Sequence, residues 1–248
     1  MSIVAKGVKA LAYALVASCL APAAMAQSVP VITPFEPVNP GGVNDRLGEA
    51  RQLAALIVAQ DGPAPKSIAD VGSFTGEFLE AFLEQFPQAK GQWTEPVDSN
   101  QKVAERRFAR FGPRVTYRIG CPGRDITLGC LPADMDVLVS SWVTIHRSAE
   151  QLRDFHRHAF AVLPKGGWVV IMDHAGAQGD WARRLKGGRE QAVGKGLAML
   201  REGPPVHHPE FVTPTLDMQL AAMREAGFAD PRVVWTRLDT VLMLARKP

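Results

Sequence analysis

The residues with the clearest chemical potential are spaced Asp70-x-Gly72-x-Phe74-x-Gly76. They follow a short apolar strand predicted over residues 66–71 and precede residues 78–83, whose apolar spacing predicts a helix. Glycine allows positive φ and close approach of the backbone, and the free N–H groups at a helix start point toward a ligand. This strand, loop and helix together predict a site for a nucleotide-like ligand.

A second short strand, predicted over residues 91–95, ends in the acid Glu95. In nucleotide-binding α/β folds, an acid roughly twenty residues after the glycine loop binds the ribose hydroxyls. Asp98 is the rival acid, but the spacing to Ala104, nine residues after Glu95, favours Glu95. The alternative for Glu95 is a solvated charge at the end of a strand.

Predicted strands and helices alternate along the rest of the chain, and this alternation predicts a parallel sheet with helices on both faces. Apolar periodicity and turn residues predict further helices over residues 45–60, 100–111, 149–162 and 218–226, and further strands over residues 114–119, 168–173, 232–238 and 241–245.

The pattern resembles the class I S-adenosylmethionine (SAM)-dependent methyltransferases over residues 45–248. Residues 70–76 are similar to the family's D-x-G-x-G-x-G, with Phe74 in place of the middle glycine. Residues 134–146 and 163–173 are similar to its later motifs, and Asp173-His174 matches an exported branch of predicted methyltransferases. The resemblance implies a Rossmann-like, doubly wound sheet of seven mostly parallel strands with helices on both faces and the last strand antiparallel.

The resemblance also implies SAM as the cofactor and assigns roles to residues of this chain. Residues of the glycine loop would face the methionine end, Glu95 the ribose, and Ser140 and Trp142 the reacting methyl. His146 and His174 are candidate general bases, and hydrogen-bonded loop histidines are the alternative for both. The implied cofactor-binding residues are Asp70, Gly72, Ser73, Thr75, Gly76, Glu95, Pro96, Ser140 and Trp142, and no Cys or His pattern indicates a metal site.

The segment 175–212 is rich in glycine and charge, and we expect it to cover the substrate site. Trp181 would line a substrate pocket there or pack against the protein. His207 and His208 are adjacent, so a solvated loop is the favoured reading for them. Tyr117 is expected to pack within the sheet. Asp173 is expected either to position His174 or to cap its loop.

The N-terminal residues 1–26 read as a signal peptide, with Lys6 and Lys9 before an apolar stretch and Ala24-Met25-Ala26 as a cleavage site. This predicts export, with the periplasm as the expected compartment and no stable membrane insertion after cleavage. A lipoprotein signal ending at Cys19 is the alternative. Residues 27–44 are predicted to form an extended arm and residues 45–248 the methyltransferase-like domain.

Composition constrains the partners of this protein. The formal net charge is +3, and loss of Lys6 and Lys9 leaves +1. No basic run is interleaved with aromatic residues, so nothing points to nucleic acid. Cys121 and Cys130 could form a disulfide in an oxidising compartment, and two unpaired thiols are the alternative.

The predicted function is methyl transfer from SAM to an unidentified, small-molecule acceptor. Because SAM is made in the cytoplasm, the export signal and Phe74 keep a second hypothesis open: an exported, non-catalytic relative that binds a nucleoside-like ligand or none. A dehydrogenase is disfavoured because no G-x-G-x-x-G occurs after a strand. The sequence indicates neither the atom methylated nor an oligomeric state.

Overall fold

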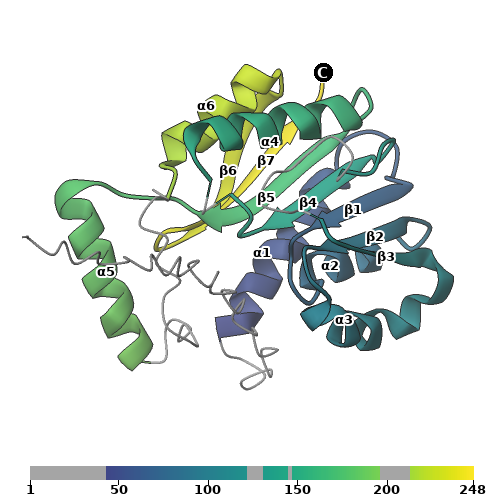
Figure 1. Cartoon of the computed structure of the whole chain (residues 1–248), viewed down its shortest axis with the longest axis horizontal. Helices are drawn as coiled ribbons and strands as arrows, with labels where there is room; N and C mark the ends of the chain where they lie inside the picture. The colour runs from purple at the N-terminus through teal and green to yellow at the C-terminus, as the bar shows by residue number, and fades with distance from the viewer. Residues whose placement is uncertain (1–42, 122–130, 145–146, 196–212) are drawn as a thin grey trace, which may run out of the picture. The chain divides into compact units, whose positions relative to one another are not determined.

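The computed structural model describes residues 43–121, 131–144, 147–195 and 213–248. The chain divides into two units, Met1–Pro30 and Val31–Pro248, and all described residues belong to the second. They form one sheet in the order β3-β2-β1-β4-β5-β7-β6 (Figure 1). Its strands are β1 (Ser67–Val71), β2 (Lys90–Glu95), β3 (Val115–Ile119), β4 (Val137–Ser141), β5 (Trp168–His174), β6 (Ala229–Arg237) and β7 (Thr240–Arg246).

The strand directions confirm the doubly wound architecture. β1 pairs in parallel with both β2 and β4, and β4 pairs in parallel with β5. β7 runs antiparallel to its neighbours β5 and β6, as predicted for the last strand. β1 and β4 are buried along nearly their whole length, which explains why they read as continuous apolar runs.

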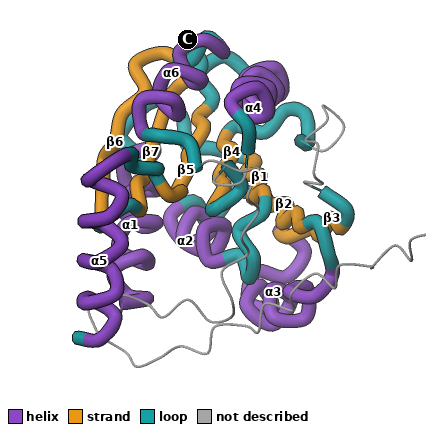
Figure 2. Tube along the Cα trace, turned by 60° about the vertical axis from the view of Figure 1, so that its left-hand side comes forward, coloured by secondary structure: helices purple, strands orange, loops and turns teal. Residues whose placement is uncertain are grey.

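Two hydrophobic cores fill the two faces of the sheet. α1 (Val43–Val58), α2 (Glu77–Gln85) and α3 (Gln101–Phe108) cover one face, and α4 (Ala149–Val162) and α6 (Leu216–Ala226) cover the other (Figures 1 and 2). α4 begins at a capping box, in which Ser148 and Gln151 each bond the other's backbone N–H. α6 ends at Gly227, whose φ of 103° suits glycine.

Two predicted segments differ from the structure. Residues 179–194, part of the segment expected to cover the substrate site, form the helix α5 (Gly179–Gly194), which the sequence pattern did not predict. The helix expected over residues 100–111 is instead α3 flanked by the 3₁₀ helices η1 (Asp98–Asn100) and η2 (Ala109–Arg114). Within η2, Gly112 takes a non-helical conformation before Pro113, which prevents the helix from continuing. Among the described residues Trp181 does not pack in a core: it is 62% exposed, with the Arg184 guanidinium over its ring.

Candidate functional site

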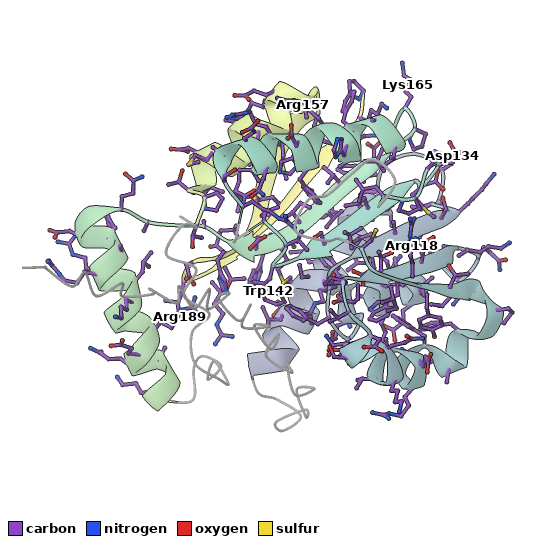
Figure 3. All side chains as sticks on the ribbon, viewed as in Figure 1. Arg118, Asp134, Trp142, Arg157, Lys165 and Arg189 are labelled. Carbon is purple, nitrogen blue, oxygen red and sulfur yellow. The ribbon has the colours of Figure 1, made fainter. Side chains whose placement is uncertain are left out.

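The carboxyl ends of β1, β2, β4 and β5 lie at one edge of the sheet. In the strand order, the chain runs outward in both directions from β1 and β4, so the crevice beyond their ends is the expected ligand site of an open α/β sheet. Figure 3 shows Trp142, which follows β4, at this edge, with Arg189 of α5 beyond it, while Asp134 and Lys165 lie at the opposite edge.

The glycine loop between β1 and α2 has a fixed conformation. Gly72 has φ 71°, and its N–H donates to the Thr94 carbonyl at 2.9 Å, which joins the loop to β2. Gly76 has φ 83°, and a Cβ there would lie 2.3 Å from Cζ of Phe108. The loop therefore needs glycine at residue 76 for two independent reasons: positive φ and close approach of a core side chain.

Phe74 takes the backbone conformation of the glycine that it replaces. Its φ is 56°, its N–H donates to Glu95 Oε1 at 2.6 Å, and its carbonyl accepts from Trp93 Nε1 at 3.0 Å. The side chain is half-buried, and its ring centroid lies 6.2 Å from that of Trp142. The ring therefore lies beside the loop after β4 and contributes to this edge of the sheet, rather than packing in the core beneath the glycine loop.

Two buried acids, Asp70 of β1 and Glu95 of β2, lie at the carboxyl ends of neighbouring strands. Glu95 is 3% exposed, and burial, reinforced by nearby Asp70, raises its pKa to about 8 against the opposing hydrogen bond from Phe74. Asp70 is fully buried, its Oδ2 accepts from the Leu79 N–H at 3.2 Å, and burial raises its pKa to about 7. Neighbouring acids with raised pKa values in a crevice are typical of functional sites.

Several buried polar atoms at this edge make no hydrogen bond of regular geometry within the described part of the chain. They come from the segments that end or follow β1, β2 and β4. These atoms are Asp70 Oδ1, Ser73 Oγ, Asn100 Oδ1 and Ser141 Oγ. Because unsatisfied buried polar groups are costly, this set suits a polar ligand such as the ribose and amino-acid parts of SAM.

His174, the last residue of β5, is engaged through both ring nitrogens. Trp142 Nε1 donates to its Nε2 at 3.1 Å, and its Nδ1 lies 3.2 Å from Thr240 Oγ1 and 3.6 Å from Asp239 Oδ1. Because Nε2 accepts, the neutral ring carries its proton on Nδ1. In this arrangement His174 positions the Trp142 indole, and Nε2 becomes available for proton removal only when that indole moves.

Asp173 and Ser140 act within the protein framework. Asp173 Oδ2 accepts from the Thr144 N–H and hydroxyl at 2.7 and 2.5 Å, and its Oδ1 accepts from the His174 N–H at 2.7 Å. The carboxylate therefore fixes the loop after β4 to the end of β5. The Ser140 hydroxyl donates to the Val71 carbonyl at 2.8 Å.

The structure brings most of the predicted residues together. Residues 70–76, Glu95, Trp142 and His174 come from the carboxyl ends of β1, β2, β4 and β5, and exposed Pro96 follows Glu95. His146, His207 and His208 lie outside the described residues. Cys121 is disulfide-bonded, and the chain's other cysteines, Cys19 and Cys130, lie outside the described residues.

Sequence reasoning missed Arg51 of α1, whose guanidinium interacts electrostatically with Asp70 and Glu77. The available signal was its spacing, since residues 47, 51, 54 and 58 share one face of a helix. Tyr117 packs as expected, with its ring 6.0 Å from that of Trp93. Among the described residues, no group of three side chains is arranged to hold a metal ion.

Comparison with solved structures identifies the fold. An O-methyltransferase family protein from Burkholderia thailandensis superposes with a TM-score of 0.56 at 16% identity, over 82% of this chain and 58% of that one. Human N-acetylserotonin methyltransferase, solved in complex with SAM, gives a TM-score of 0.54 at 15% identity, over 81% and 51%. The chain has the fold of the class I SAM-dependent methyltransferases.

A sequence relative adds to this likeness. Aclacinomycin 10-hydroxylase RdmB of Streptomyces purpurascens is 31% identical over 129 residues, which make up 51% of this chain and 33% of the relative. No protein-family profile matches the chain. The chain thus spans about a third of this curated relative and little more than half of the superposed structures.

Proposed function

We propose that the protein transfers a methyl group from SAM to a hydroxyl group of a small molecule. The observation that carries this proposal is the buried Glu95 at the end of β2, bonded to the glycine loop of β1. This pair of groups is what a nucleoside and its attached amino acid require at adjacent strand ends. Solved O-methyltransferases with the same fold support the choice of acceptor atom.

The residues divide the work of binding and alignment. Glu95 would accept hydrogen bonds from the ribose hydroxyls, and the loop of Ser73 and Thr75 would face the methionine part. When bound, SAM supplies an electrophilic methyl on a sulfonium, so the protein mainly has to align the acceptor. Trp142, held by His174, is positioned to form a wall of the acceptor site. His146 remains the candidate for removing the acceptor proton.

A second activity is favoured by one observation. The curated relative is a hydroxylase by name and matches half of this chain. Hydroxylation of the small molecule is therefore one alternative to methyl transfer. A protein that binds its ligand without any reaction is the other alternative. Phe74, which occupies the glycine position of the loop, favours the non-catalytic alternative.

A single incubation distinguishes these outcomes. The purified chain is mixed with SAM and a panel of phenols and other hydroxylated small molecules, and mass spectrometry follows both cofactor and acceptor. Methyl transfer predicts an acceptor heavier by CH₂ and an equimolar amount of S-adenosylhomocysteine (SAH). With dioxygen and a thiol reductant also present, an acceptor heavier by one oxygen atom would assign hydroxylation, in which one oxygen atom enters the acceptor and the other is reduced to water. Unchanged acceptors in a sample that binds SAH would favour the non-catalytic alternative for this panel.

We also propose that the protein is exported to the periplasm as residues 27–248, comprising the arm and the methyltransferase domain. The signal-like N-terminus and the disulfide of Cys121 support an oxidising compartment. No helix in the described part of the chain is long and apolar enough to cross a membrane. Cell fractionation with N-terminal sequencing tests this: Gln27 as the first residue in the periplasm is expected, and intact Met1 in the cytoplasm would contradict it.

A further inference from the structure

Arg51 presents a charged side chain on the core-facing side of α1. Its helical neighbours Leu47, Ala54 and Ala55 are buried. The residue as a whole is partly exposed, but its Nε is buried and donates no hydrogen bond, and Arg51 forms no ion pair within the described part of the chain. A buried donor without an acceptor is costly, and burial correspondingly lowers the pKa of this guanidinium.

Two of the acids whose charges act on Arg51 already form hydrogen bonds and ion pairs with other residues. Glu77 accepts from Arg107 at 2.9 Å and from the Thr75 hydroxyl at 2.5 Å. Glu80 accepts from Arg107 at 2.5 Å and from Arg110 at 2.8 Å. The other nearby acid, Asp70, forms no ion pair within the described part of the chain, and the side chain beside its carboxylate is that of Ser73.

These neighbours place the guanidinium beside the glycine loop. α1 packs against α2, and the charges that act on Arg51 include Asp70, next to the end of β1, and Glu77, the first residue of α2. α2 begins at Gly76 with no side-chain cap, so the first N–H groups of this helix add positive potential at the same place. A guanidinium without an ion pair and a buried carboxylate thus lie near the start of α2.

This arrangement suits a ligand group that carries both charges. We propose that Arg51 binds the α-carboxylate of the methionine part of SAM, with Asp70 on the side of the α-ammonium. The inference rests on the proposed function and extends it by naming the residue of α1 that recognises the amino-acid end. The bound carboxylate gives the guanidinium the acceptor that Glu77 and Glu80 do not provide.

The test compares two ligands that differ in this end alone. SAH carries the amino-acid group, whereas 5′-methylthioadenosine keeps the nucleoside and the thioether and lacks it. Calorimetry should show that Arg51→Met weakens SAH binding by about 10- to 100-fold, as for loss of a charge-assisted pair, and leaves methylthioadenosine binding unchanged. Arg51→Lys, which keeps the charge, should lie between. The control Arg157→Met removes an exposed arginine of α4 and should change neither affinity.

Thermal unfolding gives a readout independent of affinity. Without ligand, Arg51→Met should melt at the same temperature as the wild type or higher, because an unpaired buried charge is removed. The rise in melting temperature caused by SAH should shrink. A purely structural arginine would show the opposite, namely a lower melting temperature without ligand, and Arg51→Lys would then restore it.

The outcomes separate the inference from the proposed function. Tight SAH binding by the wild type and equally tight binding by Arg51→Met would overturn the role of Arg51 alone. Equal loss of SAH and methylthioadenosine would also overturn it, because the effect would not be specific to the amino-acid end. A folded wild type that binds neither ligand would overturn the proposed function, and with it this inference.

Discussion

At the scale of single residues, Glu95 makes cofactor binding depend on pH. Because burial raises its pKa to about 8, the carboxyl group is mostly protonated at neutral pH and must ionise to accept two ribose hydroxyls. We expect SAH affinity to rise by up to about tenfold per pH unit below about pH 8 and to level off above it.

The variant Glu95→Gln separates this effect from Asp70, whose pKa is about 7. It should bind SAH more weakly and lose the pH dependence between about pH 7 and pH 8, leaving the lower part of the profile to Asp70. Calorimetry across this range makes the comparison. An identical pH profile in wild type and Glu95→Gln would show that another group is titrating.

Phe74 offers a prediction about backbone strain. Its φ of 56° is unfavourable for any residue with a Cβ. Phe74→Ala and Phe74→Gly both remove the ring contact with Trp142, but only glycine also relieves the backbone. In urea denaturation, Phe74→Gly should therefore be more stable than Phe74→Ala by about 1 kcal/mol. Equal stabilities would mean that the loop relaxes to negative φ when the ring is absent.

At the scale of elements, Arg107 of α3 fastens the glycine loop and α2. Its Nε donates to the Thr75 carbonyl at 2.9 Å, and its other nitrogens pair with Glu77 and Glu80. Arg107→Met should lower the free energy of unfolding by about 1–3 kcal/mol, because a loop carbonyl and two carboxylates lose a charged donor.

Hydrogen exchange should rise in the loop and at the start of α2 in Arg107→Met. Arg110→Met is the matched control, since Arg110 is exposed and forms surface ion pairs with Glu80 and Glu84 that contribute little. If both variants lose the same stability, Arg107 has no special role in holding the loop.

The elements differ in how well the sequence predicts them, for identifiable reasons. α4 begins and ends at the predicted residues, because Ser148 caps its start and Leu163-Pro164 stops it. α5 was missed, since it is exposed at most positions, contains Gly187 and Gly188, and shows no apolar stripe that would predict it.

The candidate site shows the same division between local and long-range information. The loop glycines were predicted because their spacing is local to one strand and its turn, and Glu95 was predicted because it ends the next strand along the chain. The engagement of His174 by Trp142 and Thr240 was not predictable, because it joins three strands that are distant in sequence. Likewise, spacing alone places Arg51 on the buried face of α1. Spacing does not predict that other arginines form the ion pairs with the acids near it.

At the scale of the whole molecule, His156 makes the stability of the fold depend on pH. The residue belongs to α4 and is fully buried beside Gln219 of α6. Its ring nitrogens make no hydrogen bond of regular geometry, and burial lowers its pKa to about 4. The unfolded chain binds a proton below about pH 6.5, where the folded chain does not, so stability falls as pH falls from about 6.5 toward 4.

The variant His156→Leu isolates this contribution. Measured relative to wild type, its free energy of unfolding should be about 2 kcal/mol higher at pH 5 than at pH 7.5, so the variant is relatively more stable at pH 5, because leucine has no proton to gain on unfolding. Urea denaturation of both proteins at the two pH values measures this difference. A constant difference would show that His156 can be protonated within the fold.

The central claim is that this chain binds SAM at the carboxyl edge of its sheet, with Glu95 on the ribose. Calorimetric titration of the purified chain with SAH, alongside Glu95→Ala, tests it most directly. We predict micromolar or tighter binding to the wild type and loss of binding in a variant that remains folded by circular dichroism. A folded wild type that does not bind SAH, or a Glu95→Ala variant that binds it equally well, would contradict this claim.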